Sequence, residues 1–252
     1  MKENKLKTGR KHAVVTGLFF ISASASAIAG VLLYGPILGP DYLVKGAQNS
    51  ANVIWGAIFE LILAVSNIGT GIMLYPKLRR YSESWGLGYV CFRMLEVVFI
   101  MVGILAVLGI LTLSHQYIST PNPDKSMFET VGRILKEIHM YTFILGPKYM
   151  LGVNTFIYSL IFFRSKLVIR PLALLGIFGA VLIFITAVVE MFGIVVPLST
   201  TEVILAMPIA IYEMILAGWL ITKGFNEDTS HNVSSSIPIQ YGKRKESALQ
   251  SV

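Results

Sequence analysis

The sequence predicts an all-α fold, a polytopic bundle of about six transmembrane helices. Of the 252 residues, 54% are hydrophobic and 14% are charged, and the mean hydropathy is +0.68. Soluble domains carry about 25% charged residues. The apolar residues form runs near the length of about 20 residues that crosses a hydrocarbon core about 30 Å thick. A backbone in lipid must satisfy its own hydrogen bonds, which favours helices for runs of this length.

Six apolar runs follow one another along the chain and form a single membrane domain, residues 13–225. A basic arm, 1–12, precedes it, and a Ser- and Asn-rich tail, 226–252, follows and is predicted to be disordered. The first run also resembles a cleavable signal peptide around Ser22, but it continues through Leu33, which favours a retained helix. The six predicted spans are 13–35, 52–75, 87–114, 139–163, 171–196 and 203–223.

The positive charges predict the orientation of the spans. Lys and Arg are enriched on the cytoplasmic side of membrane proteins. The segments outside the predicted spans alternate between rich and poor in Lys and Arg along the chain. This places 15 of these residues on one side of the membrane and four on the other, so we expect both termini inside. The 15 are Lys2, Lys5, Lys7, Arg10, Lys11, Lys77, Arg79, Arg80, Arg164, Lys166, Arg170, Lys223, Lys243, Arg244 and Lys245; the four are Lys45, Lys125, Arg133 and Lys136.

The segment 115–138 between the third and fourth spans has a helical pattern of its own. Asn122 is the expected N-cap, with Pro123 at the first helical position. Apolar residues then recur at helical spacing. Two structures fit this pattern: an amphipathic helix on the outer membrane surface, or an extension of the fourth helix beyond the membrane. The apolar positions are Met127, Phe128, Val131, Ile134, Leu135 and Ile138.

Ionisable residues inside the apolar runs are the most informative feature of the sequence. Each costs on the order of 2.5–3.5 kcal/mol at a helix centre, so they should face one another or a wet cavity. Arg93 and Glu96 are three residues apart and can pair on one face of a helix. Such a pair can equally be a structural clasp without chemistry. The six residues are Glu60, Arg93, Glu96, Lys148, Glu190 and Glu213.

Glu213 and Glu190 carry different expectations. No cation lies within one turn of Glu213 on its own helix, so its expected partner is Lys148 or Arg93 across the bundle. Without a partner, Glu213 is a candidate for proton binding. Glu190 lies toward the outer end of the fifth span, where it can reach the lipid headgroups.

The fourth span contains Gly146-Pro147, followed by Lys148 and, two turns on, by Asn154. Proline removes a backbone donor and clashes with the carbonyl four residues back, so we expect a kink there. A kink with polar groups is typical of a small-ligand or ion pocket in transporters. Proline is also common in membrane helices that bind nothing, and both interpretations stay open.

Several other classes of function find little support. There is no catalytic motif, and the single Cys91 excludes an intrachain disulfide framework. His115 and His139 lie at span ends, where they are expected to be solvated rather than to hold zinc with Glu190 or Glu202. We therefore predict no metal and no cofactor. Because the positive charges mark topology, we expect the lipid bilayer and not nucleic acid as partner.

The chain resembles the bacterial domain-of-unknown-function family 4386 of polytopic membrane proteins, over about residues 10–225. The family pattern includes a set of polar residues and a Gly-Pro pair that this chain matches, but the resemblance implies no activity. The matching positions are Glu60, Arg93, Glu96, His139, Gly146-Pro147, Asn154 and Glu213. Met140-Tyr141 and Lys148 depart from the family pattern, in which Asp-Trp and a small residue are usual. The stretches that carry it are RKHAVVTGLFFISA, YGPILGPDYLV, FELILAVSNIGTGIMLYPKLRR, GYVCFRMLE, HMYTFILGPKYMLGVNTFIYSLIFFRS and MPIAIYEMILAGWLITKGF.

Three hypotheses for function follow. The favoured one is a non-enzymatic protein of the bacterial cytoplasmic membrane with a polar seam among spans 2, 3, 4 and 6, which binds or passes a small ligand, lipid or proton. The second is an intramembrane enzyme acting on lipids, with Glu213 or Glu60 and His139 as acid and base. The third is an accessory or immunity-type protein that works through partner contacts. The oligomeric state is left open.

Overall fold

A computed structural model of the chain describes residues 2–226, and every regular element within them is a helix. This confirms the predicted all-α class. The elements in chain order are α1 (Lys2–Leu33), α2 (Gly35–Leu38), α3 (Tyr42–Gln48), α4 (Ser50–Leu78), α5 (Glu83–Ser119), α6 (Lys125–Ile144), the π-helical segment η1 (Leu145–Met150), α7 (Leu151–Ser165), α8 (Arg170–Met191) and α9 (Thr200–Thr222).

Five of the six predicted spans coincide with single helices that are long and apolar enough to cross a membrane: α1 from Gly9 onward, α4, α5, α8 and α9. The chain is therefore a membrane protein. The fifth span ends at Met191, five residues before the predicted boundary at 196, because Gly193 adopts a positive φ of 71° and turns the chain. The predicted tail lies outside the described residues, apart from Asn226 at its start.

The remaining predicted span, the fourth (139–163), is built from the end of α6, the segment η1 and α7. In η1, the amide of Leu151 donates to the carbonyl of Gly146, five residues back, in place of the usual four. Gly146 and Pro147 lie inside this wider turn. Because the span is divided in this way, no single helix covers it.

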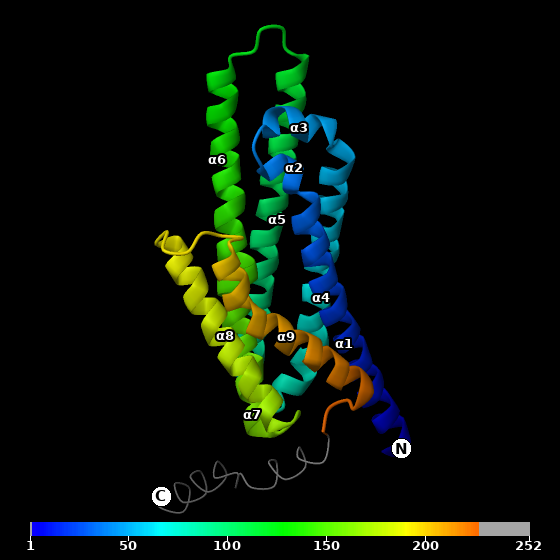
Figure 1. Cartoon of the computed structure of the whole chain (residues 1–252). Coiled ribbons are helices and arrows are strands. Elements are labelled where there is room, and N and C mark those ends of the chain that lie inside the picture. Colours follow the sequence, from blue (N-terminus) through cyan, green and yellow to red (C-terminus); the bar gives the residue numbers. More distant parts are fainter. Residues whose placement is uncertain (1, 227–252) are drawn as a thin grey trace, which may run out of the picture.

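The hairpin of α5 and α6 extends beyond the rest of the bundle (Figure 1). With 37 residues, α5 is about 55 Å long at 1.5 Å per residue, against a hydrocarbon core about 30 Å thick. The segment 125–138 stands against α5 as part of this hairpin, so of the two expected structures the extension of the fourth helix is the one found. Its N-cap is Asp124, whose carboxylate accepts from the amides of Ser126 and Met127, and the predicted N-cap at Asn122 was wrong.

The first and last spans lie side by side, and α1 packs against both α4 and α9. The start of α1 and the end of α9 reach the same end of the bundle, where α4 and α7 also end (Figure 1). Arg10 donates to the carbonyl of Ile221 at 2.9 Å, and the amide of Asn226 donates to Leu167, between α7 and α8, at 2.9 Å. The described chain therefore begins and ends on one side.

Candidate functional site: buried polar clusters in the bundle

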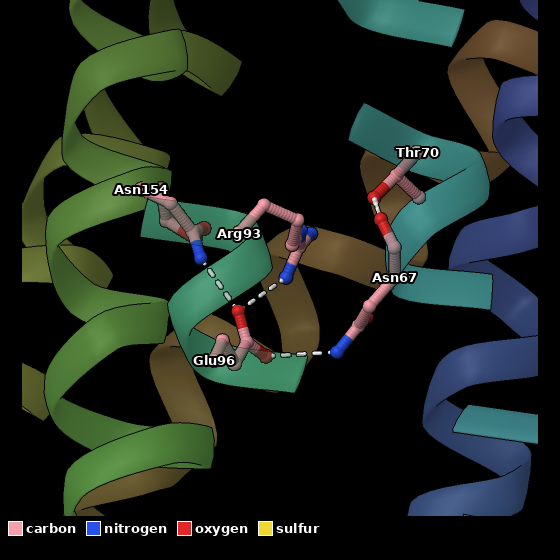
Figure 2. Close-up of polar contacts among 6 residues, drawn as sticks. Asn67, Thr70, Arg93, Glu96 and Asn154 are labelled. Atoms are coloured by element: carbon pink, nitrogen blue, oxygen red, sulfur yellow. Dashed lines mark hydrogen bonds and ion pairs between the residues drawn. The ribbon is translucent and has the colours of Figure 1, made fainter. Parts of the chain in front are cut away.

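Glu96 of α5 is the centre of a hydrogen-bond network that joins three helices (Figure 2). Its Oε2 accepts from Arg93 at 2.9 Å and from Asn154 of α7 at 2.6 Å, and its Oε1 accepts from Asn67 of α4 at 2.9 Å. Arg93, Glu96 and Asn154 are at most 3% exposed. The predicted pair of Arg93 and Glu96 therefore forms, and two amides complete its coordination.

The other side of Arg93 lacks partners. Its Nε and the hydroxyls of Tyr89 and Tyr158 are buried and have no hydrogen-bond partner among the described residues. The guanidinium lies 6.0 Å from the centre of the Tyr89 ring, and the rings of Tyr89 and Tyr158 lie 5.6 Å apart, edge to face. Buried polar atoms in proteins nearly always have a partner, often an ordered water. Three unpartnered polar atoms thus lie near one another inside the bundle.

Glu213 of α9 lies beside this group. Its carboxylate is within range of charge interaction with Arg93, Glu96 and Tyr158, but it forms no hydrogen bond or ion pair with another described residue. Neither of its two expected partners, Lys148 or Arg93, forms an ion pair with it. Arg93 is the nearer cation, although it does not come within ion-pair distance.

Glu60 and His139 belong to a second cluster, around Tyr34. The Tyr34 hydroxyl donates to Glu60 Oε2 at 3.0 Å, and the Tyr34 ring lies edge to face with the His139 ring at 5.7 Å. His139 Nδ1 is 3.3 Å from the carbonyl of Gly103. Gly103 is two helical turns beyond Glu96 on α5, about 10 Å along the axis. The two clusters are therefore separate along the bundle, and the six predicted site residues do not meet at one point.

Lys148 forms a third cluster, and this corrects the expectation for Glu190. Lys148 Nζ donates to both carboxylate oxygens of Glu190 at 2.8 Å and lies 3.2 Å from Glu202 Oε1. All three side chains are buried. Glu190 does not reach toward headgroups as predicted, because the start of α9 covers it. The cluster ties η1 to α8 and α9.

Asn67 and Tyr34 were absent from the candidate residues that the sequence suggested, and Glu202 was considered only as a zinc ligand and not as a partner of Lys148. Asn67 is a polar residue seven positions after Glu60, in the same apolar run, and this spacing was the available signal. Tyr34 and Glu202 stand at helix ends, where polar residues are common, so nothing in the sequence marked them.

No three His, Cys, Asp or Glu side chains among the described residues are grouped so that they could hold a metal ion. His115 lies apart from the three clusters, with its Nε2 2.9 Å from the hydroxyl of Ser50. The clusters can therefore offer charge, hydrogen bonds and proton exchange.

Comparison with known proteins gives one result. No curated protein and no solved structure matches the chain. Residues 15–224 match a family described as "Domain of unknown function (DUF4386)", and this region contains the membrane helices and all three clusters. The chain belongs to this family of uncharacterised proteins, DUF4386.

Proposed function

We propose that this protein lies in the bacterial cytoplasmic membrane with both ends inside, and that it binds and passes a proton at the centre formed by Arg93, Glu96 and Glu213. The side that carries both ends of the described chain is also the side with most of the positive charge, which supports this orientation. The bacterial setting rests on the family resemblance.

The observation that carries the proposal is the group of unpartnered polar atoms on Arg93, Tyr89 and Tyr158. Such atoms are expensive inside a membrane unless a water or another polar molecule satisfies them. A water at this point would connect the Arg93–Glu96 pair with Glu213. A water that bridges polar groups gives a proton a path between them.

The two carboxylates have different roles in this scheme. Glu96 already accepts three hydrogen bonds, so it can take a proton only by giving up one of them. Glu213 has no donor to displace. Glu213 is therefore the group that exchanges the proton, and Glu96 holds Arg93 in place beside it.

The test is proton flux in liposomes that contain a pH-sensitive dye. After a pH jump outside, wild-type protein should equilibrate the interior faster than empty liposomes, and Glu213→Gln should remove most of the difference. Glu83→Gln is the matched control, because Glu83 is an exposed acid at the start of α5, away from the centre. Equal rates for wild type and Glu213→Gln would contradict the proposal.

A further inference from the structure

A groove of about 530 Å³ lies outside the membrane spans, between α3 and the first half of α6. Its volume is within the range of about 300–1,000 Å³ that is typical of small-molecule sites. It lies along the first half of α6, in the α5–α6 hairpin whose tip extends beyond the bundle (Figure 1). Its charges are separate from the three buried clusters.

Contacts between the helices fix the walls of the groove. The Tyr42 hydroxyl donates to the carbonyl of Glu129 at 3.2 Å. Lys136 Nζ lies 4.7 Å from the centre of the Tyr42 ring and donates to the carbonyl of Gly39 at 3.3 Å. Gly132 allows this approach, because a Cβ there would collide with the Tyr42 side chain. The groove is therefore formed before any ligand arrives.

One face of α6 lines the groove with complementary polar groups. Ser126, Thr130, Arg133 and Glu137 follow each other at helical spacing of three and four residues, which places them on one face. Arg133 and Glu137 are exposed, and neither forms a hydrogen bond or ion pair with another described residue. Two further charged side chains line the groove: Glu129 pairs with Lys125 at 3.5 Å, and Lys136 donates to the carbonyl of Gly39 and lies within charge range of Glu137. The groove thus presents two hydroxyls, together with the guanidinium of Arg133 and the carboxylate of Glu137, neither of which is in an ion pair with another described residue.

We propose that this groove binds a small zwitterion, a molecule with one acidic group and one ammonium group. The acidic group pairs with Arg133, whose planar fork matches a carboxylate or phosphate, and the hydroxyl of Thr130 lies one turn away to donate as well. The ammonium group pairs with Glu137. Each free charge of the groove then has a partner of opposite sign on one ligand.

The order of the charges favours a dissolved molecule over a lipid headgroup. The chain of α6 runs from the tip of the hairpin toward the membrane, so Arg133 lies farther from the bilayer than Glu137. A zwitterionic phospholipid has the opposite order, with its phosphate near the bilayer and its ammonium outward. A lipid would therefore set like charges against each other in the groove.

The experiment is calorimetric titration of the full chain in detergent with γ-aminobutyrate and O-phosphoethanolamine. Butyrate and butylamine carry one charge each and serve as matched probes. We expect at least one zwitterion to bind about tenfold or more tightly than both single-charge probes, because a lost charged contact costs about a factor of ten or more. Arg133→Gln and Glu137→Gln should each weaken that zwitterion about tenfold. Lys45→Gln, an exposed cation on α3 outside the groove, should leave it unchanged.

Three outcomes would overturn the proposal: no binding of either zwitterion at millimolar concentration, equal binding of the single-charge probes, or equal loss in Lys45→Gln. The same titration in nanodiscs tests whether the ligand of the groove is a lipid headgroup and not a dissolved molecule. Affinity should be the same in phosphatidylethanolamine and phosphatidylglycerol discs, and competition by phosphatidylethanolamine would assign the groove to a headgroup instead.

Discussion

The cluster around Arg93 and the cluster around Lys148 use similar groups with a different balance of charge. Arg93 faces one carboxylate, Glu96, which two neutral amides also bind. Lys148 faces two carboxylates, Glu190 and Glu202. When all groups are ionised, the hydrogen-bonded pair of Arg93 and Glu96 is neutral, with Glu213 beside it outside ion-pair distance, whereas the ion-paired set of Lys148, Glu190 and Glu202 carries one negative charge.

The two clusters also differ in how many of their buried polar atoms lack a hydrogen-bond partner. The ammonium group of Lys148 contacts Glu190 and Glu202 and lies 4.7 Å from the centre of the Phe143 ring. This cluster therefore holds η1, α8 and α9 together. Arg93 keeps an unpartnered Nε beside two unpartnered hydroxyls. The comparison teaches that a buried ion pair is better interpreted from its unsatisfied atoms than from its charges. The Lys148 cluster has the character of a clasp, and the Arg93 cluster that of a site.

The largest expected effect is that of Arg93→Ala. Removal of the cation leaves Glu96 as an uncompensated buried charge, which costs about 3–5 kcal/mol. Unfolding of the detergent-solubilised protein, followed by circular dichroism, measures the loss. Adding Glu96→Leu should recover most of it, since removing both charges is much cheaper than removing one. A loss below about 1 kcal/mol in the single variant would contradict a buried, mutually dependent pair.

Lys148→Met should cost about 3 kcal/mol at neutral pH, since breaking a buried pair leaves Glu190 and Glu202 facing each other. Unfolding of the detergent-solubilised protein at neutral pH, followed by circular dichroism, measures the loss. A loss below about 1 kcal/mol would contradict a buried cluster that depends on Lys148.

Tyr34→Phe extends the comparison to the Glu60 cluster. The substitution removes the hydroxyl that donates to Glu60 and leaves the ring that contacts His139. The loss of a hydrogen bond to a charged group predicts a cost of about 1.5–3 kcal/mol. Tyr81→Phe is a control on an exposed tyrosine. Equal stability of the two variants would show that Glu60 does not depend on Tyr34.

Glu202→Gln should have the smallest effect, about 0.5–1.5 kcal/mol. Lys148 keeps both bonds to Glu190, and the surplus negative charge disappears. Glu190→Gln should cost more, because it breaks the shorter contacts at 2.8 Å. Thermal unfolding of the two variants side by side gives the order, and a reversed order would make Glu202 the main partner of Lys148.

Local regularities predicted much of this molecule. The lengths of the apolar runs located the membrane helices, and the spacing of Arg93 and Glu96 was enough to predict their pair. The contacts of Lys148 depend on how α8 and α9 approach η1, and no spacing within one helix specifies that. The same holds for Tyr34 and Glu60, which come from different helices. The early end of α8 depends on Gly193, whose conformation the hydropathy pattern does not reveal.

The wide turn at η1 determines how the side chains of α7 are oriented around the helix axis relative to those of α6. Each residue of an α-helix advances the side chains by about 100°, and a π-helical turn accommodates one residue more than an α-helical turn does. Deleting one residue from Leu145–Met150 would therefore remove the one extra residue of the π-helical turn. The helix α6 would then continue into α7 as an ordinary α-helix. Asn154 would then keep its register relative to α6, and the normal helix would replace the bulge. Inserting a residue into α7 before Asn154 would instead turn the amide about 100° away from Glu96. The bulge thus marks where this span can change length by one residue while both of its faces stay aligned.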